Sequence, residues 1–275
     1  MTSARQPPPA PAPLPPALDQ VGDGVPLLLL HAFPLSRRMW RPQLAGLADA
    51  CRLLAPDLPG FGGSAPLPAA VCSMEDMAGA ALGVLDALGL PSAVVCGLSM
   101  GGYVALALCE RCPERVRGLV LADTRATADD AAGRQRRLAA ALEAESRGPA
   151  ALADTLVPRL LSARTREERP ELVAWLRREI AAAPAAGFAA AQRGMAARPD
   201  RTALLRRLAM PALVVVGEED ELTPPAHSVE LARQIPGARL VTIAGAGHLS
   251  NLEQPEAFNG AMRDFMRDFR KKVPS

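Results

Sequence analysis

The chain has 275 residues, which is enough for one large α/β domain or for a core with a smaller insertion. Its formal net charge is +2, from 31 basic and 29 acidic residues, so we expect neither nucleic acid nor an anionic membrane as a partner. No apolar run approaches the length that spans a bilayer, and the N-terminus lacks the charged-then-apolar pattern of a signal peptide.

The five cysteines are an odd number in a long chain, which favours reduced thiols in the cytoplasm over a disulfide framework. Cys109 and Cys112 are spaced as C-x-x-C, but no second pair or thioredoxin-like setting accompanies them. We interpret them as two residues of a helix that ends at Pro113, and we expect no metal site.

Residues 1–16 are rich in proline and alanine, a composition that cannot build a packed core. We expect a disordered or polyproline-like tail over residues 1–20, ahead of a folded core that begins at residue 21. A proline motif that binds another domain is the alternative interpretation of this segment.

Six nearly continuous apolar runs follow, as strands buried on both faces of a sheet require. They lie at 25–31, 51–56, 92–97, 116–122, 211–217 and 238–244. Helical patterns lie between or after them at 74–89, 100–112 and 253–271, and Ser73 with Asp76 predicts an N-cap for the first. This alternation predicts an α/β fold, with a mostly parallel central sheet and helices on both faces.

The alternation breaks between residues 125 and 208, where helical patterns occur without a strand-like run. A helical insertion between two parallel strands cannot enter the sheet, and the chain leaves the preceding strand at the carboxyl edge, where ligands bind in open α/β sheets. We therefore expect a helical cap over a pocket at 125–208, on a core formed by 21–124 and 209–275.

The segment GLSMGG at 97–102 follows a predicted strand and opens a predicted helix. A sharp strand-to-helix turn holds a serine hydroxyl clear of the sheet, and its neighbours two residues away must be small. Ser99 with Gly97 and Gly101 therefore predicts a nucleophile elbow.

A serine nucleophile needs a base, and histidine titrates near neutral pH. Of the three histidines, His248 follows the last predicted strand on a glycine-rich loop, at the same sheet edge as Ser99. His31 ends a strand and His227 lies just inside a helix, so we interpret these two as structural and as a surface residue.

The base needs an orienting carboxylate, and Asp220 follows the strand 211–217. Its competitors are Asp123, at the end of the strand 116–122, and three nearby glutamates, Glu218, Glu219 and Glu221. The chain order Ser, Asp, His favours Asp220, because this is the order expected of nucleophile, acid and base on a sheet of this kind.

Two backbone N–H groups must hold the oxyanion of an acyl-transfer reaction. Met100, at the start of the helix after Ser99, is one candidate. Phe33 is the other, because it lies in the turn after the first strand and the next residue, Pro34, has no N–H.

The motifs in this order resemble the α/β-hydrolase superfamily over roughly residues 25–270: HAFP at 31–34, DLPGFGGS at 57–64, GLSMGG at 97–102, GEEDELTPP at 217–225 and GAGH at 245–248. The segments LLLLHAFPLSRRMW, GLSMGGYVAL and PERVRGLVLADT are most similar to the 3-oxoadipate enol-lactonase and small carboxylesterase branch. The resemblance implies the α/β-hydrolase fold, a helical cap after the sixth strand, no cofactor, and the catalytic and oxyanion residues named above.

Two features depart from that pattern. Ala32 replaces the glycine of the usual HGFP turn, and its methyl group could narrow the approach to the acyl site. The proline-rich N-terminus stands where the family has a β-hairpin, so we expect the first strands to be short or missing.

The sequence thus predicts hydrolysis of a small-molecule ester or lactone through an acyl-enzyme. A perhydrolase or haloperoxidase without cofactor and an acyltransferase use the same three residues, and a ligand-binding protein on a hydrolase scaffold is the non-enzymatic alternative; a dehalogenase would need aspartate in place of Ser99. Cationic groups for a dicarboxylate lactone could come from Arg37, Arg38 or Arg125. Further candidate substrate contacts are Trp40, Trp175 and Phe188, although helix packing is the alternative role for the two cap aromatics. The composition indicates no particular oligomeric state.

Overall fold

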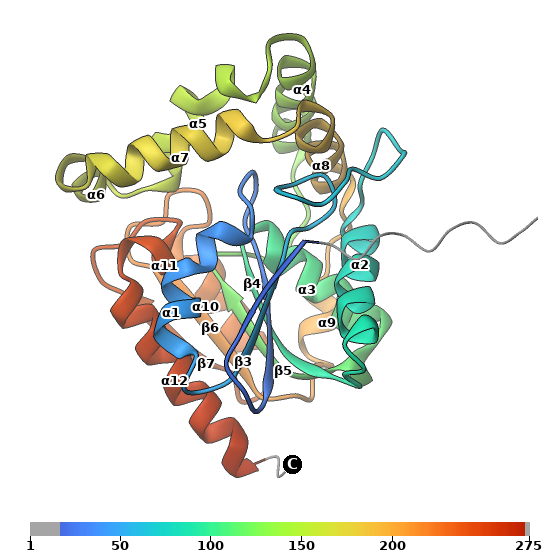
Figure 1. Cartoon of the computed structure of the whole chain (residues 1–275), viewed down its shortest axis with the longest axis vertical. Helices are drawn as coiled ribbons and strands as arrows, with labels where there is room; N and C mark the ends of the chain where they lie inside the picture. The colour runs from blue at the N-terminus through green and yellow to red at the C-terminus, as the bar shows by residue number, and fades with distance from the viewer. Residues whose placement is uncertain (1–16, 273–275) are drawn as a thin grey trace, which may run out of the picture.

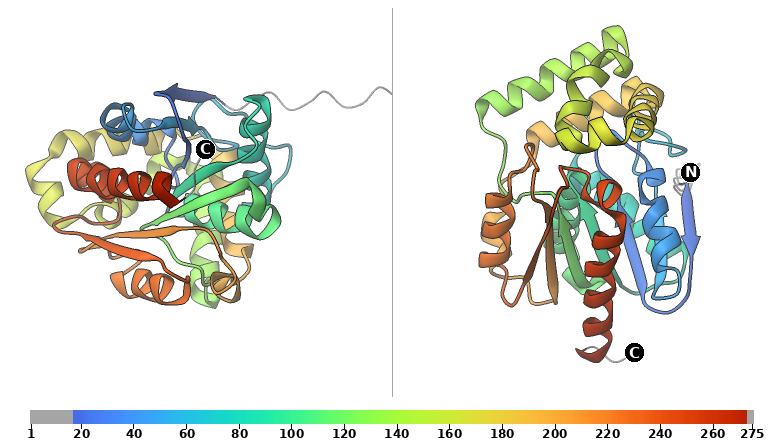
Figure 2. Two further views of the ribbon diagram at one scale, coloured as in Figure 1. Left: turned by 90° about the horizontal axis from the view of Figure 1, so that it is seen from below. Right: turned by 90° about the vertical axis from the view of Figure 1, so that its left-hand side faces the viewer.

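The computed structural model describes residues 17–272, and these form a seven-stranded sheet with a helical layer on each face and a helical cap at one end (Figures 1 and 2). The strand order is β1-β3-β2-β4-β5-β6-β7, and every neighbouring pair is parallel except β1 with β3. The strands are β1 Leu18–Val21, β2 Pro26–Leu30, β3 Arg52–Pro56, β4 Ala93–Leu98, β5 Val116–Ala122, β6 Ala212–Gly217 and β7 Arg239–Ile243. The predicted α/β fold is confirmed.

Strand β1 corrects the prediction for the N-terminus. Leu18 pairs with Pro56 and Val21 with Leu53, so residues 18–20, which were expected in the tail, belong to the sheet. These residues lie beyond the proline-rich stretch, and their backbone groups find partners on the edge of β3. Residues 1–16, where the tail itself was predicted, lie outside the described residues.

The helices of the core cover both faces of the sheet, because alternate strand residues point to opposite faces. Leu28 and Leu30 of β2 pack with α2 and α3, whereas Leu27 and Leu29 pack with α1 and α12. At the start of α2, Ser73 and Asp76 form the predicted capping box. The core helices are α1 Arg41–Leu47, α2 Met74–Ala87, α3 Met100–Arg111, α9 Thr202–Leu205, α10 Pro225–Gln234, α11 Ser250–Glu253 and α12 Pro255–Lys272, with short 3₁₀ turns at Arg37–Trp40 and Pro113–Arg115.

The segment between β5 and β6 contains helices and no strand, as predicted. Its helices are α4 Ala131–Arg147, α5 Ala153–Leu160, α6 Ala163–Glu168, α7 Pro170–Ala182 and α8 Ala185–Ala197, with a 3₁₀ turn at Pro149–Leu152. They lie across the carboxyl end of the sheet, at the top of Figure 1. Among the described residues only β1 precedes β2, so this cap follows the fifth strand and not the sixth.

The cysteines are free thiols, and the C-x-x-C spacing marks the end of α3, as interpreted from the sequence. Burial raises the pKa of Cys51 to about 11, and those of Cys72 and Cys109 to about 12. The described residues hold no group of three or more His, Cys, Asp or Glu side chains that could bind a metal ion. Between residues 17 and 272 we find no helix whose length and apolar character together would let it cross a membrane.

Candidate active site

Ser99 occupies a strained turn between β4 and α3. Its φ of 54° and ψ of −113° are values that a residue with a side chain rarely adopts. Two hydrogen bonds hold this backbone in place: the Ser99 N–H donates to the Ala122 carbonyl at 2.9 Å, and the Thr124 hydroxyl donates to the Ser99 carbonyl at 2.8 Å. This conformation raises the serine side chain off the end of the sheet.

The glycines on either side of Ser99 are required by close backbone contacts. A Cβ at Gly97 would lie 2.1 Å from the carbonyl oxygen of Gly101, and a Cβ at Gly101 would lie 2.0 Å from that of Leu30. Both contacts are with backbone, which cannot move aside as a flexible side chain can. The predicted elbow residues thus meet the steric demand that the sequence motif implied.

The structure brings His248 and Asp220 to Ser99, from loops after β7 and β6. The imidazole Nε2 lies 2.8 Å from the Ser99 Oγ, and its Nδ1 lies 2.9 Å from Asp220 Oδ2. His248 and Asp220 are 2% and 3% exposed, so water competes little for these hydrogen bonds. Three side chains from distant parts of the sequence therefore form one hydrogen-bonded chain.

Asp220 is held as a carboxylate. Burial by itself raises the pKa of Asp220, but the charge of His248 and hydrogen bonds from His248 and Thr223 outweigh it, and the pKa lies below its ordinary value. The Thr223 hydroxyl donates to Oδ2 at 2.6 Å, and the Leu222 and Thr223 N–H groups donate to Oδ1 at 2.9 Å. Thr223 was missed from the sequence, although a hydroxyl three residues after an aspartate in a loop is a recognisable signal.

Asp123, the alternative candidate for the orienting carboxylate, forms hydrogen bonds with groups other than His248. Its Oδ1 accepts the Gly217 N–H at 2.8 Å, and its Oδ2 lies 2.5 Å from the Ser250 hydroxyl. Burial and the negative charge of Asp220 raise the pKa of Asp123 well above its ordinary value. The three competing glutamates, Glu218, Glu219 and Glu221, are exposed.

The two predicted oxyanion donors lie close to the serine turn and have no acceptor of their own. Within residues 17–272, no acceptor takes the N–H of Phe33 or of Met100. The start of α3 packs against the end of β2, because a Cβ at Gly101 would lie 3.0 Å from the His31 carbonyl oxygen. Phe33 follows His31 by two residues, so the two free N–H groups come from adjoining segments.

The other two histidines have different environments. His31 is fully buried and bridges two loops: its Nδ1 lies 3.0 Å from the Ala32 carbonyl, and its Nε2 accepts the Leu58 N–H at 2.9 Å. Burial lowers the pKa of His31. His227 is half-buried on α10, and burial together with the charge of Arg125 lowers its pKa.

The candidate substrate contacts fall in different places. The ring of Phe188 is fully buried, 4.5 Å from that of Phe33, so it lies against the turn that carries a predicted oxyanion donor. Arg125 is ion-paired with Asp129. Trp175 is partly buried against the core on α7.

Trp40 requires a correction. Its ring is fully buried, and its nearest aromatic neighbour is Phe258 of α12, with ring centroids 6.2 Å apart. Since its ring is enclosed in the core under α12, we do not retain it as a substrate contact.

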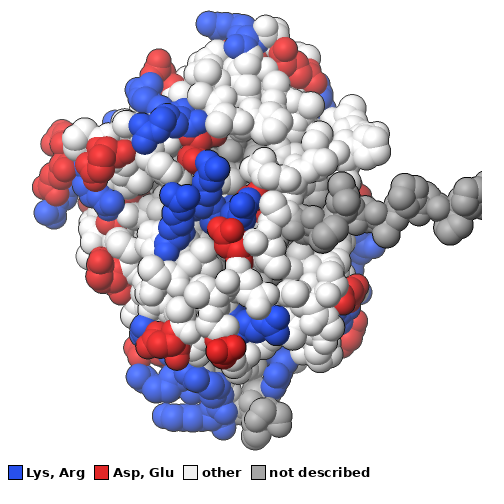
Figure 3. Space-filling view, in the orientation of Figure 1, with Lys and Arg blue, Asp and Glu red and all other residues white. Residues whose placement is uncertain are grey.

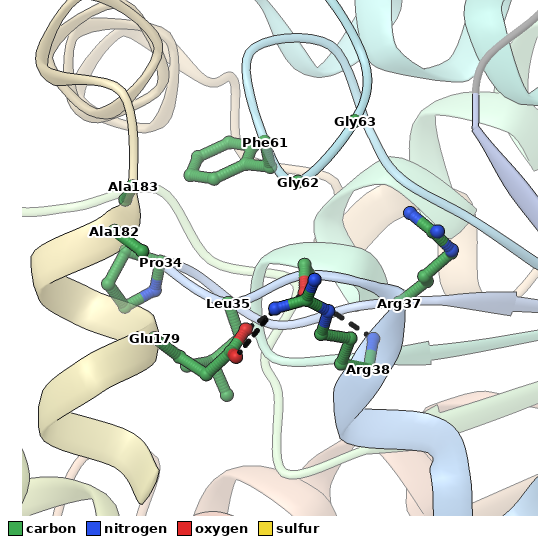
Figure 4. Close-up of a pocket in the computed structure, with 11 residues that line it drawn as sticks. Pro34, Leu35, Arg37, Arg38, Phe61, Gly62, Gly63, Glu179, Ala182 and Ala183 are labelled. Atoms are coloured by element: carbon green, nitrogen blue, oxygen red, sulfur yellow. Dashed lines mark hydrogen bonds and ion pairs between the residues drawn. The ribbon is translucent and has the colours of Figure 1, made fainter.

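A cavity of about 290 Å³ lies beside the turn after β2, where the cap meets the core (Figure 4). Arg37 and Arg38 border it, but Arg37 is paired with Asp19 and Asp57, and Arg38 with Glu179 of α7. Basic side chains near the middle of the face in Figure 3 likewise have acidic side chains beside them. The cavity is lined by Pro34, Leu35, Ser36, Arg37, Arg38, Phe61, Gly62, Gly63, Glu179, Ala182 and Ala183.

The sheet, the strained serine turn and the cap define an α/β hydrolase. A family model described as the alpha/beta hydrolase fold matches residues 25–255, and the chain belongs to this family. It is 30% identical to 3-oxoadipate enol-lactonase 2 of Acinetobacter baylyi over 243 residues, which cover 88% of this chain and 89% of that protein.

Two solved structures each resemble more than nine-tenths of the chain. A thermophilic esterase from Thermogutta terrifontis with malate bound has a TM-score of 0.90 and 42% identity, covering 92% of this chain and 93% of that one. The enol-lactonase from Burkholderia xenovorans LB400 has a TM-score of 0.85 and 31% identity, covering 91% and 96%. The relatives of this chain therefore include esterases and enol-lactonases.

Proposed function

We propose that this α/β hydrolase cleaves a carboxylic ester or lactone of a small molecule through an acyl-enzyme on Ser99. The observation that carries the proposal is the chain of hydrogen bonds from Ser99 Oγ to His248 Nε2 at 2.8 Å and from His248 Nδ1 to Asp220 at 2.9 Å. In this arrangement His248 takes the proton of Ser99 as the oxygen attacks the carbonyl carbon, and Asp220 stabilises the imidazolium.

The negative charge on the carbonyl oxygen then needs donors that are already in place. The N–H groups of Phe33 and Met100 supply them, and Met100 adds the positive end of the α3 dipole. His248 returns the proton to the alkoxide that leaves, which in a lactone stays attached to the acyl chain. A water molecule, activated by the same imidazole, finally releases the acid and restores Ser99.

The substrate class rests on two supports. The relatives named above are an esterase and two enol-lactonases, and the chain covers at least 89% of the length of each. The ring of Phe188 against Phe33 gives the site an apolar wall on the cap side, which suits the carbon skeleton of a small ester or lactone. Arg125 and Trp175 remain candidate contacts for such a substrate.

Ser99→Ala tests the proposal directly. We expect hydrolysis of a p-nitrophenyl acyl ester to fall by at least about 10⁴-fold, because the oxygen that forms the acyl-enzyme is gone. Labelling by a fluorophosphonate probe should also disappear. Ser146→Ala, which removes an exposed hydroxyl on α4, is the matched control and should keep both activities.

A panel of acyl esters of increasing chain length, together with an enol-lactone, then identifies the preferred substrate. The same assay with hydrogen peroxide or an alcohol in the mixture measures perhydrolysis and acyl transfer. Turnover by Ser99→Ala near the wild-type rate would reject the proposed mechanism.

A further inference from the structure

Glu253 is a buried carboxylate that joins the cap to the loop carrying His248. It ends the short helix α11 and is only 3% exposed. Its Oε1 accepts the N–H of Gly247 at 2.8 Å, and its Oε2 accepts the N–H of Ser162 at 2.9 Å. Gly247 directly precedes His248, whereas Ser162 lies in the cap between α5 and α6, so one side chain binds both parts.

A second hydrogen bond joins the same two segments on the other side of His248. The Leu249 N–H donates to the Leu160 carbonyl at 3.1 Å. The residues immediately before and after His248 are thus both bound, one through Glu253 and one directly, to the cap turn at 160–162. The imidazole projects from a backbone that the cap holds at two points.

The two segments are also in close steric contact. A Cβ at Gly247 would lie 2.6 Å from the Ser162 nitrogen and 3.0 Å from the Leu161 carbonyl carbon. The loop therefore has no room to approach the cap more closely, and the two hydrogen bonds oppose its moving away. Arg169, from the junction of α6 and α7, adds hydrogen bonds to the Leu252 and Glu253 carbonyls at 2.9 and 3.2 Å.

Burial of the Glu253 carboxylate costs free energy, because no opposite charge among residues 17–272 compensates it. Within the described residues the Glu253 carboxylate accepts the N–H groups of Gly247 and Ser162 and forms no ion pair with a lysine or arginine, and its negative charge contributes to the raised pKa of Asp123. A buried carboxylate without a cationic partner costs free energy, whereas its hydrogen bonds to two N–H groups are charge-assisted and well directed. The arrangement favours placement of the loop over stability.

We propose that Glu253 is a positioning residue. By accepting the N–H groups of Gly247 and Ser162, it ties the loop that carries His248 to the cap turn at 160–162, and this contact fixes the distance between His248 and Ser99. This rests on the proposed function, since the distance matters only if His248 takes the Ser99 proton. A displacement of about 1 Å in such a contact lowers a rate by up to about 10²-fold.

Glu253→Gln is the first test, because the amide has the same shape but presents an N–H₂ group to one of the two N–H donors. We expect kcat for a p-nitrophenyl ester to fall about tenfold with KM changed less than about twofold, since substrate binding groups are untouched. Labelling by a small fluorophosphonate should slow by the same factor. Glu256→Gln, an exposed glutamate in the next helix, is the matched control and should leave both rates unchanged.

A stability control separates positioning from simple loss of structure. Ser73→Ala removes the hydroxyl that caps α2 by accepting the Asp76 N–H at 3.0 Å, and it leaves Glu253, Gly247 and the cap turn at 160–162 unchanged. We expect this variant to melt at a lower temperature without a loss in kcat. If Glu253→Gln instead lowers the melting temperature and leaves kcat and labelling unchanged, its role is structural and the proposal is wrong.

Gly247→Ala provides the same test should the Glu253 variant not fold, because its methyl group would push the loop off the cap turn. We expect a loss of kcat of at least about tenfold, and an unchanged kcat would contradict the proposal. Labelling of the wild-type protein at Ser99 tests the proposed function separately. If the wild-type protein and the variants all label at the normal rate, the positioning role is wrong, and the proposed function is not affected.

Discussion

Two buried aspartates lie at the ends of neighbouring strands and behave in opposite ways. Asp220 follows β6 and Asp123 follows β5, and both are almost or fully inaccessible to solvent. The pKa of Asp220 lies below the ordinary value, while that of Asp123 lies well above it. Burial raises both pKa values, so the direction of each shift is decided by what the carboxylate touches.

Asp220 contacts the imidazole of His248 and accepts three further hydrogen bonds, whereas Asp123 has only a backbone N–H and a hydroxyl as partners and faces the charge of Asp220. Being buried at the carboxyl edge of the sheet is therefore not enough to make an aspartate a partner for His248. The contacts with His248 and Thr223 are what keep the pKa of Asp220 low, and replacing each aspartate in turn tests this comparison.

The largest effect should come from Asp220→Asn. The amide cannot stabilise the imidazolium and favours the wrong imidazole tautomer, so we expect kcat/KM for an activated ester to fall by about 10⁴-fold. Steady-state hydrolysis of a p-nitrophenyl ester measures it. A loss of less than tenfold would assign the orienting role to a different residue.

Asp123→Asn should have a much smaller effect on activity. An amide has the same shape as a carboxyl group, and Asn can accept the Gly217 N–H, donate to the Ser250 hydroxyl and tolerate the φ of 47°. We expect kcat/KM within about threefold of wild type. Asp123→Ala, which leaves two buried partners unsatisfied, should lower stability by about 1–3 kcal/mol in urea unfolding.

The smallest expected effect is the change of the free energy of unfolding with pH. The stability that Asp123 contributes is fully present below its ordinary pKa of 3.8 and is lost as the pH rises through its raised pKa. The stability that Asp220 contributes is present above its ordinary pKa of 3.8 and is lost as the pH falls through its lowered pKa.

Urea midpoints between pH 3 and pH 8 therefore separate the two residues. Relative to wild type, Asp123→Asn should gain stability as the pH rises above 3.8, while the deficit of Asp220→Asn should shrink as the pH falls below it. Midpoint curves that stay parallel to that of wild type for both variants would contradict the opposite shifts.

The parts of the molecule that sequence patterns predicted are those governed by local rules. The run PLLLL of β2 is apolar throughout because both sheet faces are covered, and Ser73 and Asp76 are spaced to cap α2. The sequence also predicted that the residues after β4, β6 and β7 lie close together, because the carboxyl ends of parallel strands meet at the same edge of a sheet.

The remaining features depend on contacts that no local pattern encodes. Strand β1 exists because four residues pair with β3 more than thirty positions away, and Trp40 is a core residue because α12 covers it. The role of Glu253 required knowing that Ser162, 91 positions earlier, faces it. In the sequence, Glu253 stands among polar residues shortly after His248, and nothing in that pattern identifies a partner.

The buried thiols have a practical consequence for following the cap in solution. Cys51, Cys72, Cys96 and Cys109 are all buried, and burial raises the pKa of each, so maleimides and iodoacetamides, which require an accessible thiolate, should spare them in the folded protein. Only Cys112 is partly exposed. Replacing that single residue would give a background in which one cysteine introduced on α7 and another on α10 can carry a donor and an acceptor dye. Energy transfer between the dyes would then measure the distance between the cap and the core in solution.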